Sequence, residues 1–401
     1  MPEKARSFVV GVMEDRRHGL LAGTLKCVLW GMSQVYRLGI WLRIRLYEAG
    51  LLRRRSLPCL TISVGNITVG GTGKTPFVEA LASSLHERGR RVAILSRGYK
   101  SKNSPGAVDA ASCRVVKRLE AASTSVSNGE KIFLNALHAG DEPYLLAANL
   151  RGVAVLVDKD RFRAGQAAIS DMGADTLILD DGFQHISLKR DLDVVLIDSM
   201  NPFGNARLLP RGILREPLRA LRRADCFALT KATGVDTEPL RAKLRELNPQ
   251  AEIIETIHQP LYLEELLSGR REKPEFIRGK AVHAVSGIAR PDSFEEAVER
   301  LGGHIARRIR FTDHHRFTEQ EIEEILQQAS AEHVAAVVTT QKDAVRIPTL
   351  QSPPVPLYFL RVAVQVTKGT ENLADWVLRL CQARVAPERA CGSGTTHVPD
   401  A

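Results

Sequence analysis

A glycine-rich segment that ends in lysine and threonine is the strongest chemical signal in the sequence. Residues 63–76 read SVGNITVGGTGKTP. The apolar run 60–64 precedes the segment, and residues 77–85 place apolar side chains on one helical face, so we expect a strand, a loop and a helix start. Amide groups of such a loop cradle phosphate oxygens, and the helix dipole adds positive potential. The segment therefore predicts nucleotide binding. The alternative is a glycine-rich turn with a chance Gly-Lys-Thr.

The residues at the end of this loop have expected roles. Lys74 can reach the outer phosphates, and the hydroxyl of Thr75 can bind Mg²⁺. The usual phosphate-loop pattern has an additional glycine at the position where this chain has Thr68. The residues predicted to bind nucleotide are Thr68, Val69, Gly70, Gly71, Thr72, Gly73, Lys74 and Thr75.

Two acidic pairs are candidates for metal and proton chemistry. Asp180 and Asp181 follow a short apolar run, as expected for acids that hold Mg²⁺ directly or through water, although a strand-terminating turn has the same pattern. Asp141 and Glu142 precede a predicted helix at 144–150. Taken alone, this second pair is also typical of acids that cap a helix N-terminus.

Histidines and arginines supply further candidates. Residues 311–317 read FTDHHRF, and adjacent histidines point apart on a helix or strand, so we do not expect them to chelate a metal. One histidine that tunes a carboxylate is simpler chemistry, and an exposed loop is the open alternative. Cationic groups that suit phosphate recognition, or a solvated basic surface, are Lys159, Arg161, Arg207, Arg211 and Arg215.

Short apolar strands separated by helix-length segments must position these residues. From residue 58 onward the expected strands are 60–64, 92–95, 153–157, 176–179, 194–197 and 226–229. This alternation predicts a doubly wound, mostly parallel sheet of the P-loop NTPase type. Ligands of such sheets bind beyond the carboxyl ends of the strands, where the polar residues above fall.

A second, smaller α/β domain is expected after about residue 250. Its predicted elements are strands at 281–285, 334–339 and 357–360 and helices at 293–301 and 319–329. Residues 100–131 show no clean period and are expected to be irregular. The predicted domains are 1–55, an N-terminal amphipathic membrane helix region; 56–250, a kinase core; 251–385, the smaller domain; and 386–401, a disordered tail.

The N-terminal region has the composition of a helix at a membrane surface. Residues 20–36 contain a single charged residue, and Trp30, Tyr36 and Trp41 with nearby arginines suit an interfacial helix with snorkelling cations. Residues 53–55 are all arginine and favour an anionic leaflet. We predict that this helix lies on or dips into the bilayer rather than spanning it; packing on the protein's own core is the alternative.

Composition limits the class of protein. The chain has 401 residues and a formal net charge of +10, which suits nucleic acid, anionic lipid or phosphorylated small molecules. Aromatic residues are few and no recognition helix is evident, so no nucleic-acid partner is expected. The six cysteines are widely spaced and predict neither a metal site nor a disulfide framework, which favours a reducing cytoplasmic setting.

Assembled in order, these motifs resemble the tetraacyldisaccharide 4'-kinase family, the lipid A 4'-kinases. The resemblance covers most of residues 20–365 and is carried by SVGN (63–66) with GGTGKTP (70–76), SRGY (96–99), GDEP (140–143), DDGFQH (180–185), LLP (208–210) with REP (215–217), and DHH (313–315). Two features depart from the expected pattern: residues 211–213 read RGI instead of Ala-Gly-Pro, and the tail after 386 has no counterpart.

The resemblance implies a monomeric P-loop kinase that uses ATP and Mg²⁺. Its substrate would be the 4'-hydroxyl of a tetraacylated glucosamine disaccharide 1-phosphate, and it would lie on the cytoplasmic face of the inner membrane. Asp141 would be the general base together with His314. The implied metal-site residues are Thr75, Glu142, Asp180 and Asp181. The implied substrate-binding residues are Asn66, Arg97, Tyr99, Arg161, Gln184 and Arg207.

Two other classes of function are alternatives. A P-loop GTPase or ATPase switch would require a base-reading Asn-Lys-x-Asp after a strand, and residues 230–233 read TKAT. A membrane scaffold that binds nucleotide only structurally would not need Lys74, Asp141, Asp180 and Asp181 together.

Overall fold

A sheet of thirteen strands organises the part of the chain that the structure describes. The structure is a computed structural model, and it describes residues 8–9, 11–13, 15–98, 124–349, 351–370 and 372–390, with side chains to residue 382. The strands are β1 (Leu60–Asn66), β2 (Val92–Ser96), β3 (Thr124–Ser127), β4 (Ala154–Val157), β5 (Thr176–Asp180), β6 (Leu192–Asp198), β7 (Cys226–Thr230), β8 (Glu252–Glu265), β9 (Arg271–Glu272), β10 (Ala281–Ser286), β11 (His304–Arg310), β12 (Ala336–Thr340) and β13 (Leu357–Lys368).

The strand order is β11-β10-β12-β13-β8-β7-β6-β1-β5-β2-β4-β3, with β9 paired to β8. All neighbouring pairs are parallel except β13 with β8, β3 with β4, and β8 with β9. The predicted mostly parallel α/β sheet is therefore confirmed. Strand β3 lies within the segment expected to be irregular.

Helices cover both faces of the sheet. They are α2 (Leu20–Glu48), α3 (Lys74–Glu87), α5 (Ala136–Ala139), α6 (Asp141–Asn149), α7 (Arg161–Met172), α8 (Glu238–Leu247), α9 (Pro291–Arg300), α10 (Glu319–Ala331), α11 (Gln341–Ala344) and α12 (Leu373–Ala390), with 3₁₀ turns η1 (Leu218–Arg223) and η2 (Pro274–Ile277). Successive residues of β2 point to opposite faces. Val92 and Ile94 pack in the cluster that contains α3, α6 and α12, whereas Ala93 and Leu95 pack against α7.

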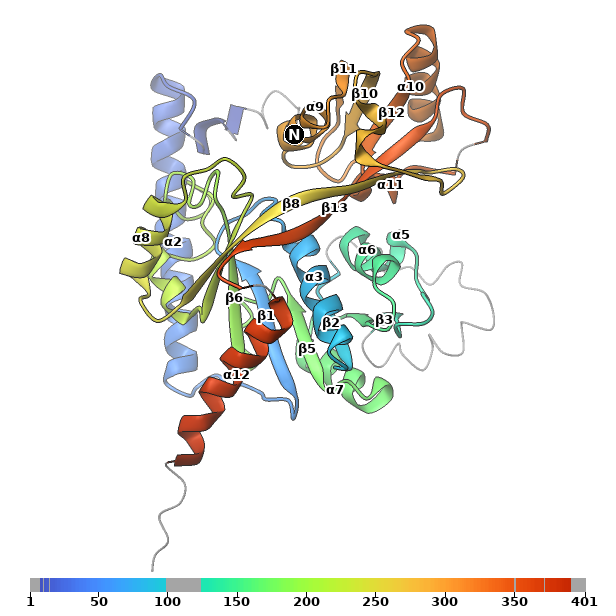
Figure 1. Ribbon diagram of the computed structural model, residues 1–401. Coiled ribbons are helices and arrows are strands. Elements are labelled where there is room, and N and C mark those ends of the chain that lie inside the picture. The colour runs from blue at the N-terminus through green and yellow to red at the C-terminus, as the bar shows by residue number, and fades with distance from the viewer. Residues whose placement is uncertain are drawn as a thin grey trace, which may run out of the picture.

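The two long strands β8 and β13 join the N-terminal core to the C-terminal half (Figure 1). They pair antiparallel from Tyr358 opposite Glu265 to Lys368 opposite Glu255. Only 357–360 of this ribbon was predicted, although the alternation of Val362, Val364 and Val366 in β13 is also typical of a strand. The ribbon makes one continuous sheet of what the sequence suggests are two domains.

Helix α2 lies along the flank of the core (Figure 1) and contacts it through a few polar groups. The buried Ser33 hydroxyl donates to the carbonyl of Leu208 at 2.9 Å and accepts from the amide of Arg211 at 3.1 Å. The Tyr36 hydroxyl donates to the carbonyl of Arg215 at 2.9 Å. Among the described helices, none combines the length and apolar character needed to cross a bilayer. At the other end, α12 continues to Ala390, so residues 386–390 are helical and 391–401 lie outside the described residues.

Candidate active site

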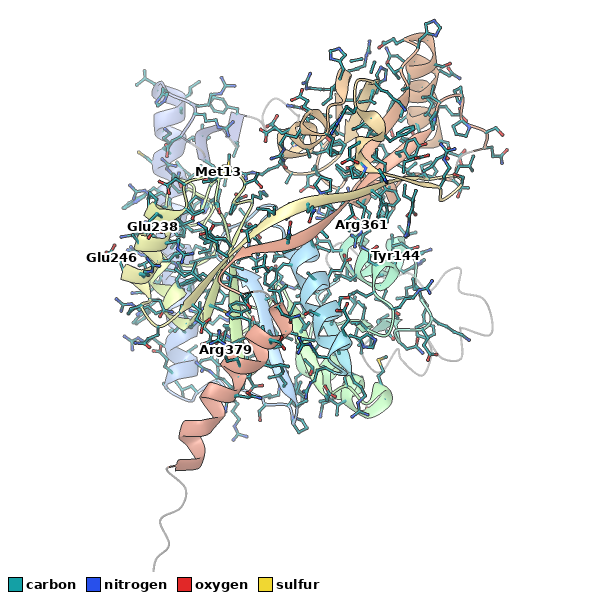
Figure 2. All side chains as sticks on the ribbon, viewed as in Figure 1. Met13, Tyr144, Glu238, Glu246, Arg361 and Arg379 are labelled. Atoms are coloured by element: carbon teal, nitrogen blue, oxygen red, sulfur yellow. The ribbon has the colours of Figure 1, made fainter. Side chains whose placement is uncertain are left out.

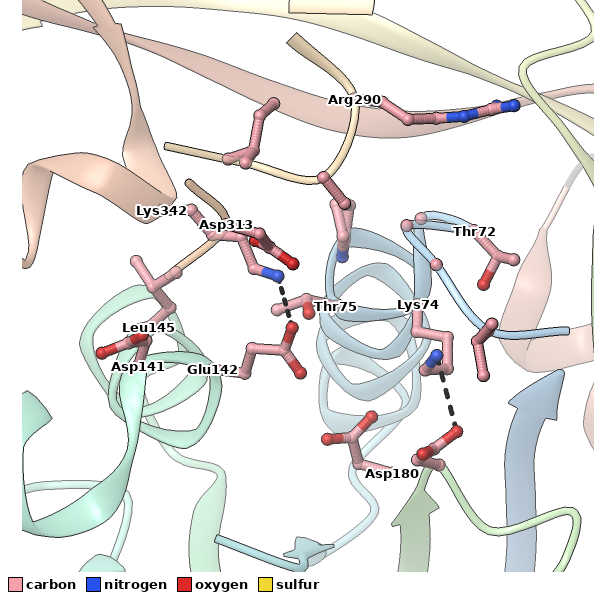
Figure 3. A pocket seen from close by; sticks show the side chains of 18 of the residues that line it. Thr72, Lys74, Thr75, Asp141, Glu142, Leu145, Asp180, Arg290, Asp313 and Lys342 are labelled. Atoms are coloured by element: carbon pink, nitrogen blue, oxygen red, sulfur yellow. Dashed lines mark hydrogen bonds and ion pairs between the residues drawn. The ribbon is translucent and has the colours of Figure 1, made fainter. Parts of the chain in front are cut away.

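A cavity of about 1160 Å³ opens at the carboxyl ends of the core strands, between the core and the C-terminal half. Its walls include the glycine-rich loop, the first turn of α6, the end of β5 and the loop that carries His314. Figure 3 shows acidic and basic side chains from these elements pointing into this space. The cavity therefore brings together motifs that lie far apart in the sequence.

The glycine-rich loop is held open by its backbone conformation and by a buried amide. Gly70 and Gly73 have φ values of 115° and 79°, which side-chain-bearing residues rarely adopt. Asn66 is fully buried, and its amide nitrogen donates to the Thr68 carbonyl at 2.7 Å and to the Thr72 hydroxyl at 3.1 Å. Helix α3 begins at Lys74, so its first-turn amides and the loop amides form a site for anionic oxygens.

The two acids at the end of β5 have different environments. Asp181 accepts two hydrogen bonds from Arg215, at 2.8 and 2.7 Å, and forms an ion pair with Lys74 at 3.5 Å. Burial raises the pKa of Asp181, but the charges of Lys74 and Arg215 outweigh burial and lower the pKa overall. Asp180 is buried, and burial together with the charges of Glu142 and Asp181 raises its pKa to about 6.

The surroundings of Asp180 fit a bound cation. Its Oδ2 accepts from the Ser96 hydroxyl at 3.1 Å, while its buried Oδ1 has no hydrogen-bond partner among the described residues. An unpartnered buried carboxylate oxygen beside a phosphate loop is a suitable ligand for Mg²⁺. No group of three or more metal-ligating side chains occurs in the described ranges. Such a group is not required, because in P-loop enzymes a hydroxyl, phosphates and water supply the other ligands.

Asp141 lies at the first turn of α6 and has one restrained and one unrestrained oxygen. Its Oδ2 lies 3.1 Å from His314 Nδ1 and accepts from Arg346 Nε at 2.7 Å. Its buried Oδ1 is without a hydrogen-bond partner in the described structure. Burial raises the pKa of Asp141, but the hydrogen bond from His314 and the charge of Arg346 outweigh it, and the pKa is lowered. The carboxylate is thus ionised at neutral pH and offers one free oxygen.

His314 and His315 turn away from each other, as expected of adjacent histidines. His314 has a φ of 64° and lies beside Asp141, whereas His315 Nε2 lies 3.1 Å from both carboxylate oxygens of Glu321. Arg346 is almost fully buried and also lies 3.1 Å from His314 Nδ1. Because Nδ1 either donates to Asp141 or accepts from Arg346, these two neighbours decide between them which ring nitrogen of His314 carries the proton.

Glu142, the second acid of α6, is paired across the cavity. Lys342 of α11 forms a short ion pair with Glu142 (Figure 3). Burial raises the pKa of Glu142, but Lys342, Lys74 and His314 outweigh burial and lower it. Glu142 therefore faces cations from both halves of the molecule.

The predicted residues divide into those that line the cavity and those that support it. Every predicted catalytic and metal-site residue lines it, as do residues 69–75. Of the predicted substrate-binding residues, Arg97, Arg161 and Gln184 also line it. Arg161 is nearly buried and its guanidinium donates to the carbonyls of Asp158 at 2.7 Å and Asp180 at 3.1 Å, which restrains it.

Three predicted residues that the structure describes do not contribute to the cavity wall. Asn66 and Thr68 are buried behind the loop, where Asn66 braces the backbone. Arg207 is exposed and lies outside the lining, because the turn at 208–214 directs Leu209 and Arg215 into the cavity instead. Tyr99 lies outside the described residues.

Several lining residues were not predicted as site residues. Lys342 lies in the polar segment 340–344, which follows a predicted strand. The position at a strand end is visible in the sequence, but the residue types alone indicate no particular chemistry. Lys231 donates to the Gly71 carbonyl at 2.9 Å and to Asp198 at 2.7 Å, and Arg290 donates to the same Asp198 carboxylate at 2.6 Å. Arg346 does not line the cavity but donates to Asp141, and no pattern in the sequence marks it.

Comparison with known proteins agrees with this geometry. A family model described as Tetraacyldisaccharide-1-P 4'-kinase matches residues 25–382. A tetraacyldisaccharide 4'-kinase of Anaeromyxobacter sp. (strain Fw109-5) is 41% identical over 344 residues, which cover 85% of this chain and 88% of the relative. That of Halothermothrix orenii is 35% identical over 393 residues, covering 94% and 98%. The crystal structure of LpxK from Aquifex aeolicus in complex with ATP has a TM-score of 0.67 and 30% identity, covering 89% of this chain and 99% of that one.

Proposed function

Because the chain belongs to the tetraacyldisaccharide 4'-kinase family, we propose that it phosphorylates the 4'-hydroxyl of a tetraacylated glucosamine disaccharide 1-phosphate with ATP. This reaction is a late step of lipid A biosynthesis. One observation carries the mechanism: Lys74 and Asp141, from separate motifs, line the same cavity. A nucleotide polyphosphate at the loop and a sugar hydroxyl at Asp141 would then meet in one space.

The loop amides, the first turn of α3 and Lys74 bind the phosphates and offset their negative charge. Asp141 orients the sugar hydroxyl through its free Oδ1 and takes its proton as the oxygen attacks the γ-phosphorus. His314 and Arg346 hold the other carboxylate oxygen and keep Asp141 aimed. Thr75 and Asp180 would hold Mg²⁺, which when bound would neutralise charge on the β- and γ-phosphates.

The experiment that tests this function is transfer of radiolabel from [γ-³²P]ATP to a disaccharide monophosphate lipid in detergent micelles with the purified full-length protein. We expect label in the lipid at the 4'-position. A protein that hydrolyses ATP without labelling the lipid, or that labels it at another position, would contradict the proposal. Competition between GTP and ATP for the site distinguishes this kinase from a GTPase switch.

We further propose that α2 attaches the enzyme to the inner leaflet of the cytoplasmic membrane. Its large apolar side chains are exposed, with Leu20 at 91%, Val35 at 73% and Leu38 at 61%. Arg53, Arg54 and Arg55 follow the helix and would attract anionic lipid. The acyl chains of the substrate cost ~0.8 kcal/mol per methylene exposed to water, so a bilayer-bound enzyme meets its substrate at lower free energy.

Flotation with vesicles tests the membrane proposal. We expect the full chain to float with phosphatidylglycerol-containing vesicles, whereas a variant without residues 1–50 stays in the soluble fraction. An unchanged distribution would refute attachment through α2. The truncated protein must retain cooperative thermal unfolding, so that aggregation is distinguished from membrane binding.

A further inference from the structure

Lys342 extends into the active-site cavity from the half of the molecule that does not carry the phosphate loop. It belongs to α11, in the C-terminal half, and its ammonium group contacts Glu142 of α6 in the core. In Figure 3, Lys342 points toward Glu142, and Lys74 and Thr75 lie at the start of α3, which lines the same cavity. The lysine is therefore placed among the groups expected to meet the transferred phosphoryl group.

The backbone that carries Lys342 is fixed on both sides. The next residue, Asp343, is fully buried, and its carboxylate accepts from the Gly287 amide at 3.1 Å, the Thr340 hydroxyl at 2.7 Å and Arg346 at 3.1 Å. Such a fully satisfied buried carboxylate is rigid. Since Arg346 also holds Asp141, the lysine and the proposed base share one support.

The preceding residue is anchored to the core. The Gln341 amide nitrogen donates to Asn149 of α6 at 2.9 Å, and its oxygen accepts from Arg361 of β13 at 2.7 Å. With both neighbours held, the Lys342 side chain enters the cavity from a defined point. This pre-organisation is what electrostatic catalysis requires, because a fixed charge needs no reorganisation during the reaction.

Glu142 is paired with Lys342 and also lies in the field of Lys74. The charges of Lys342 and Lys74 both act on its carboxylate, and the charge of Glu142 in turn acts on Asp180. A nucleotide polyphosphate bound at Lys74 would bring several further negative charges to the same region. The doubly or more negatively charged polyphosphate would then compete with the single charge of Glu142 for Lys342.

The path of transfer lies beside this pair. Glu142 and Lys342 line the same cavity as Lys74 and Asp141, between which the proposed transfer of the phosphoryl group takes place. Charge spreads over the three outer oxygens of the phosphoryl group in the transition state. A cation at this point stabilises that charge.

We propose that Lys342 is a catalytic residue that exchanges Glu142 for the γ-phosphoryl group and delivers positive charge to it from the C-terminal half. This inference rests on the proposed function. The sugar oxygen forms the new bond to phosphorus, the bond to the β–γ bridging oxygen breaks, and ADP leaves with that electron pair. Asp141 takes the hydroxyl proton, and Lys342 takes no part in the proton transfer.

The test compares Lys342→Met and Lys342→Arg with wild-type enzyme in the radiolabel assay, with Lys368→Met as the matched control. Lys368 is exposed and lies far along β13, with an ion pair to Glu255 at 3.5 Å. We expect Lys342→Met to lower kcat roughly 100- to 1000-fold, the effect of removing one donor that stabilises transition-state charge. Lys342→Arg should recover part of the loss, and Lys368→Met should match wild type.

A second measurement separates a contact with phosphate from a structural role. We expect Lys342→Met to reduce the preference for ATP over ADP in equilibrium binding at least 10-fold, with ADP affinity and thermal midpoint close to wild type. The effect of Lys342→Met on kcat must also persist without the Glu142 charge. We therefore expect the double variant with Glu142→Gln to have a lower kcat than Glu142→Gln alone. Equal loss of ATP and ADP binding, no further loss in the Glu142→Gln background, or kcat above half of wild type would each overturn the proposal.

The binding comparison also distinguishes failure of this inference from failure of the proposed function. It needs no lipid acceptor. If wild-type enzyme does not label the disaccharide lipid, the proposed function fails, while the ATP-over-ADP preference still reports whether Lys342 contacts the γ-phosphate.

Discussion

At the level of single residues, the carboxylate of Asp141 shows how a base is kept ionised and aimed at once. One oxygen is held by His314 and Arg346, and the other is left unpartnered within the described structure. The cations around it lower its pKa, so it stays charged below neutral pH. A lowered pKa also makes Asp141 a weaker base. Holding the sugar hydroxyl in position for attack offsets this loss of basicity.

Replacing Asp141 with alanine tests this arrangement. We expect kcat to fall roughly 100- to 10,000-fold, the range for loss of a general base, while ATP affinity changes little because the loop does not use Asp141. Steady-state kinetics with an independent ATP-binding measurement checks this. Asp171→Ala, an exposed acid on α7, is the control. Wild-type turnover in the Asp141 variant would remove it as the base.

Two histidines make the fold sensitive to acid. Burial lowers the pKa of His185 and of His258 from 6.5 to about 4, with Arg161 and Lys231 respectively adding to the effect. Between pH 6.5 and about pH 4, these histidines bind protons in the unfolded chain but not in the folded protein. The free energy of unfolding therefore falls as the pH drops below 6.5. His258 should contribute about 2 kcal/mol of this loss at pH 5, and the more exposed His185 should contribute less because solvent screens it.

Urea denaturation at pH 7 and pH 5 measures the effect for the wild type and for His258→Gln. The variant should lose less stability on acidification, since glutamine does not titrate. The same pH dependence in both proteins would show that His258 is already protonated in the folded state or equally shielded in the unfolded one.

At the level of elements, the end of β1 and the turn after β5 must approach closely to assemble the phosphate site. Gly65 makes this possible: a Cβ there would lie 2.6 Å from the backbone nitrogen of Phe183. Phe183 is fully buried and follows Asp180 and Asp181 by only a few residues. The glycine of the SVGN motif is thus needed for packing, which places the acids beside the loop.

Gly65→Ala should displace the turn after β5. We expect about 1–3 kcal/mol of destabilisation, typical of overpacking, and a loss of kcat larger than the loss of ADP affinity. Gly39→Ala is the matched control, because a Cβ there meets no atom within 4 Å and alanine favours the helix. Thermal unfolding and steady-state kinetics of both variants test this prediction. If Gly65→Ala behaves like Gly39→Ala, the turn after β5 accommodates the added methyl group and the prediction is wrong.

At the level of the whole molecule, the site depends on how the C-terminal half sits over the core. The β8–β13 ribbon connects them, and Arg361 on β13 lies where they meet (Figure 2). Its guanidinium pairs with Glu79 of α3 and donates to Gln341 of α11. One side chain thus links the phosphate-loop helix to the helix that carries Lys342.

Arg361→Met should leave Glu79 with its buried charge unpaired. We expect destabilisation of about 3 kcal/mol, together with faster amide hydrogen exchange in α3 and α11, because both helices lose a common restraint. Denaturation with hydrogen-exchange mass spectrometry checks both parts. The control is Arg379→Met. Arg379 is an exposed arginine of α12 that pairs with Glu252, and its replacement should change amide hydrogen exchange only locally.

The sequence by itself determined the local parts of this protein. The strand, glycine loop and helix around residues 60–87, and the acids that follow β5, are specified by apolar periodicity and by residue types within a short span. These patterns also specified the parallel core of the sheet, since β1, β2, β5, β6 and β7 are buried along almost their whole length. The order of the motifs predicted the family to which the chain belongs.

Only the tertiary structure decided which distant side chains meet. Asp141 is separated from His314 by 173 residues and from Arg346 by 205, and Glu142 is separated from Lys342 by 200. Long-range ion pairs of this kind leave no period in the sequence. The antiparallel ribbon of β8 and β13 brings the two halves together, and its pairing depends on register between strands rather than on the composition of either.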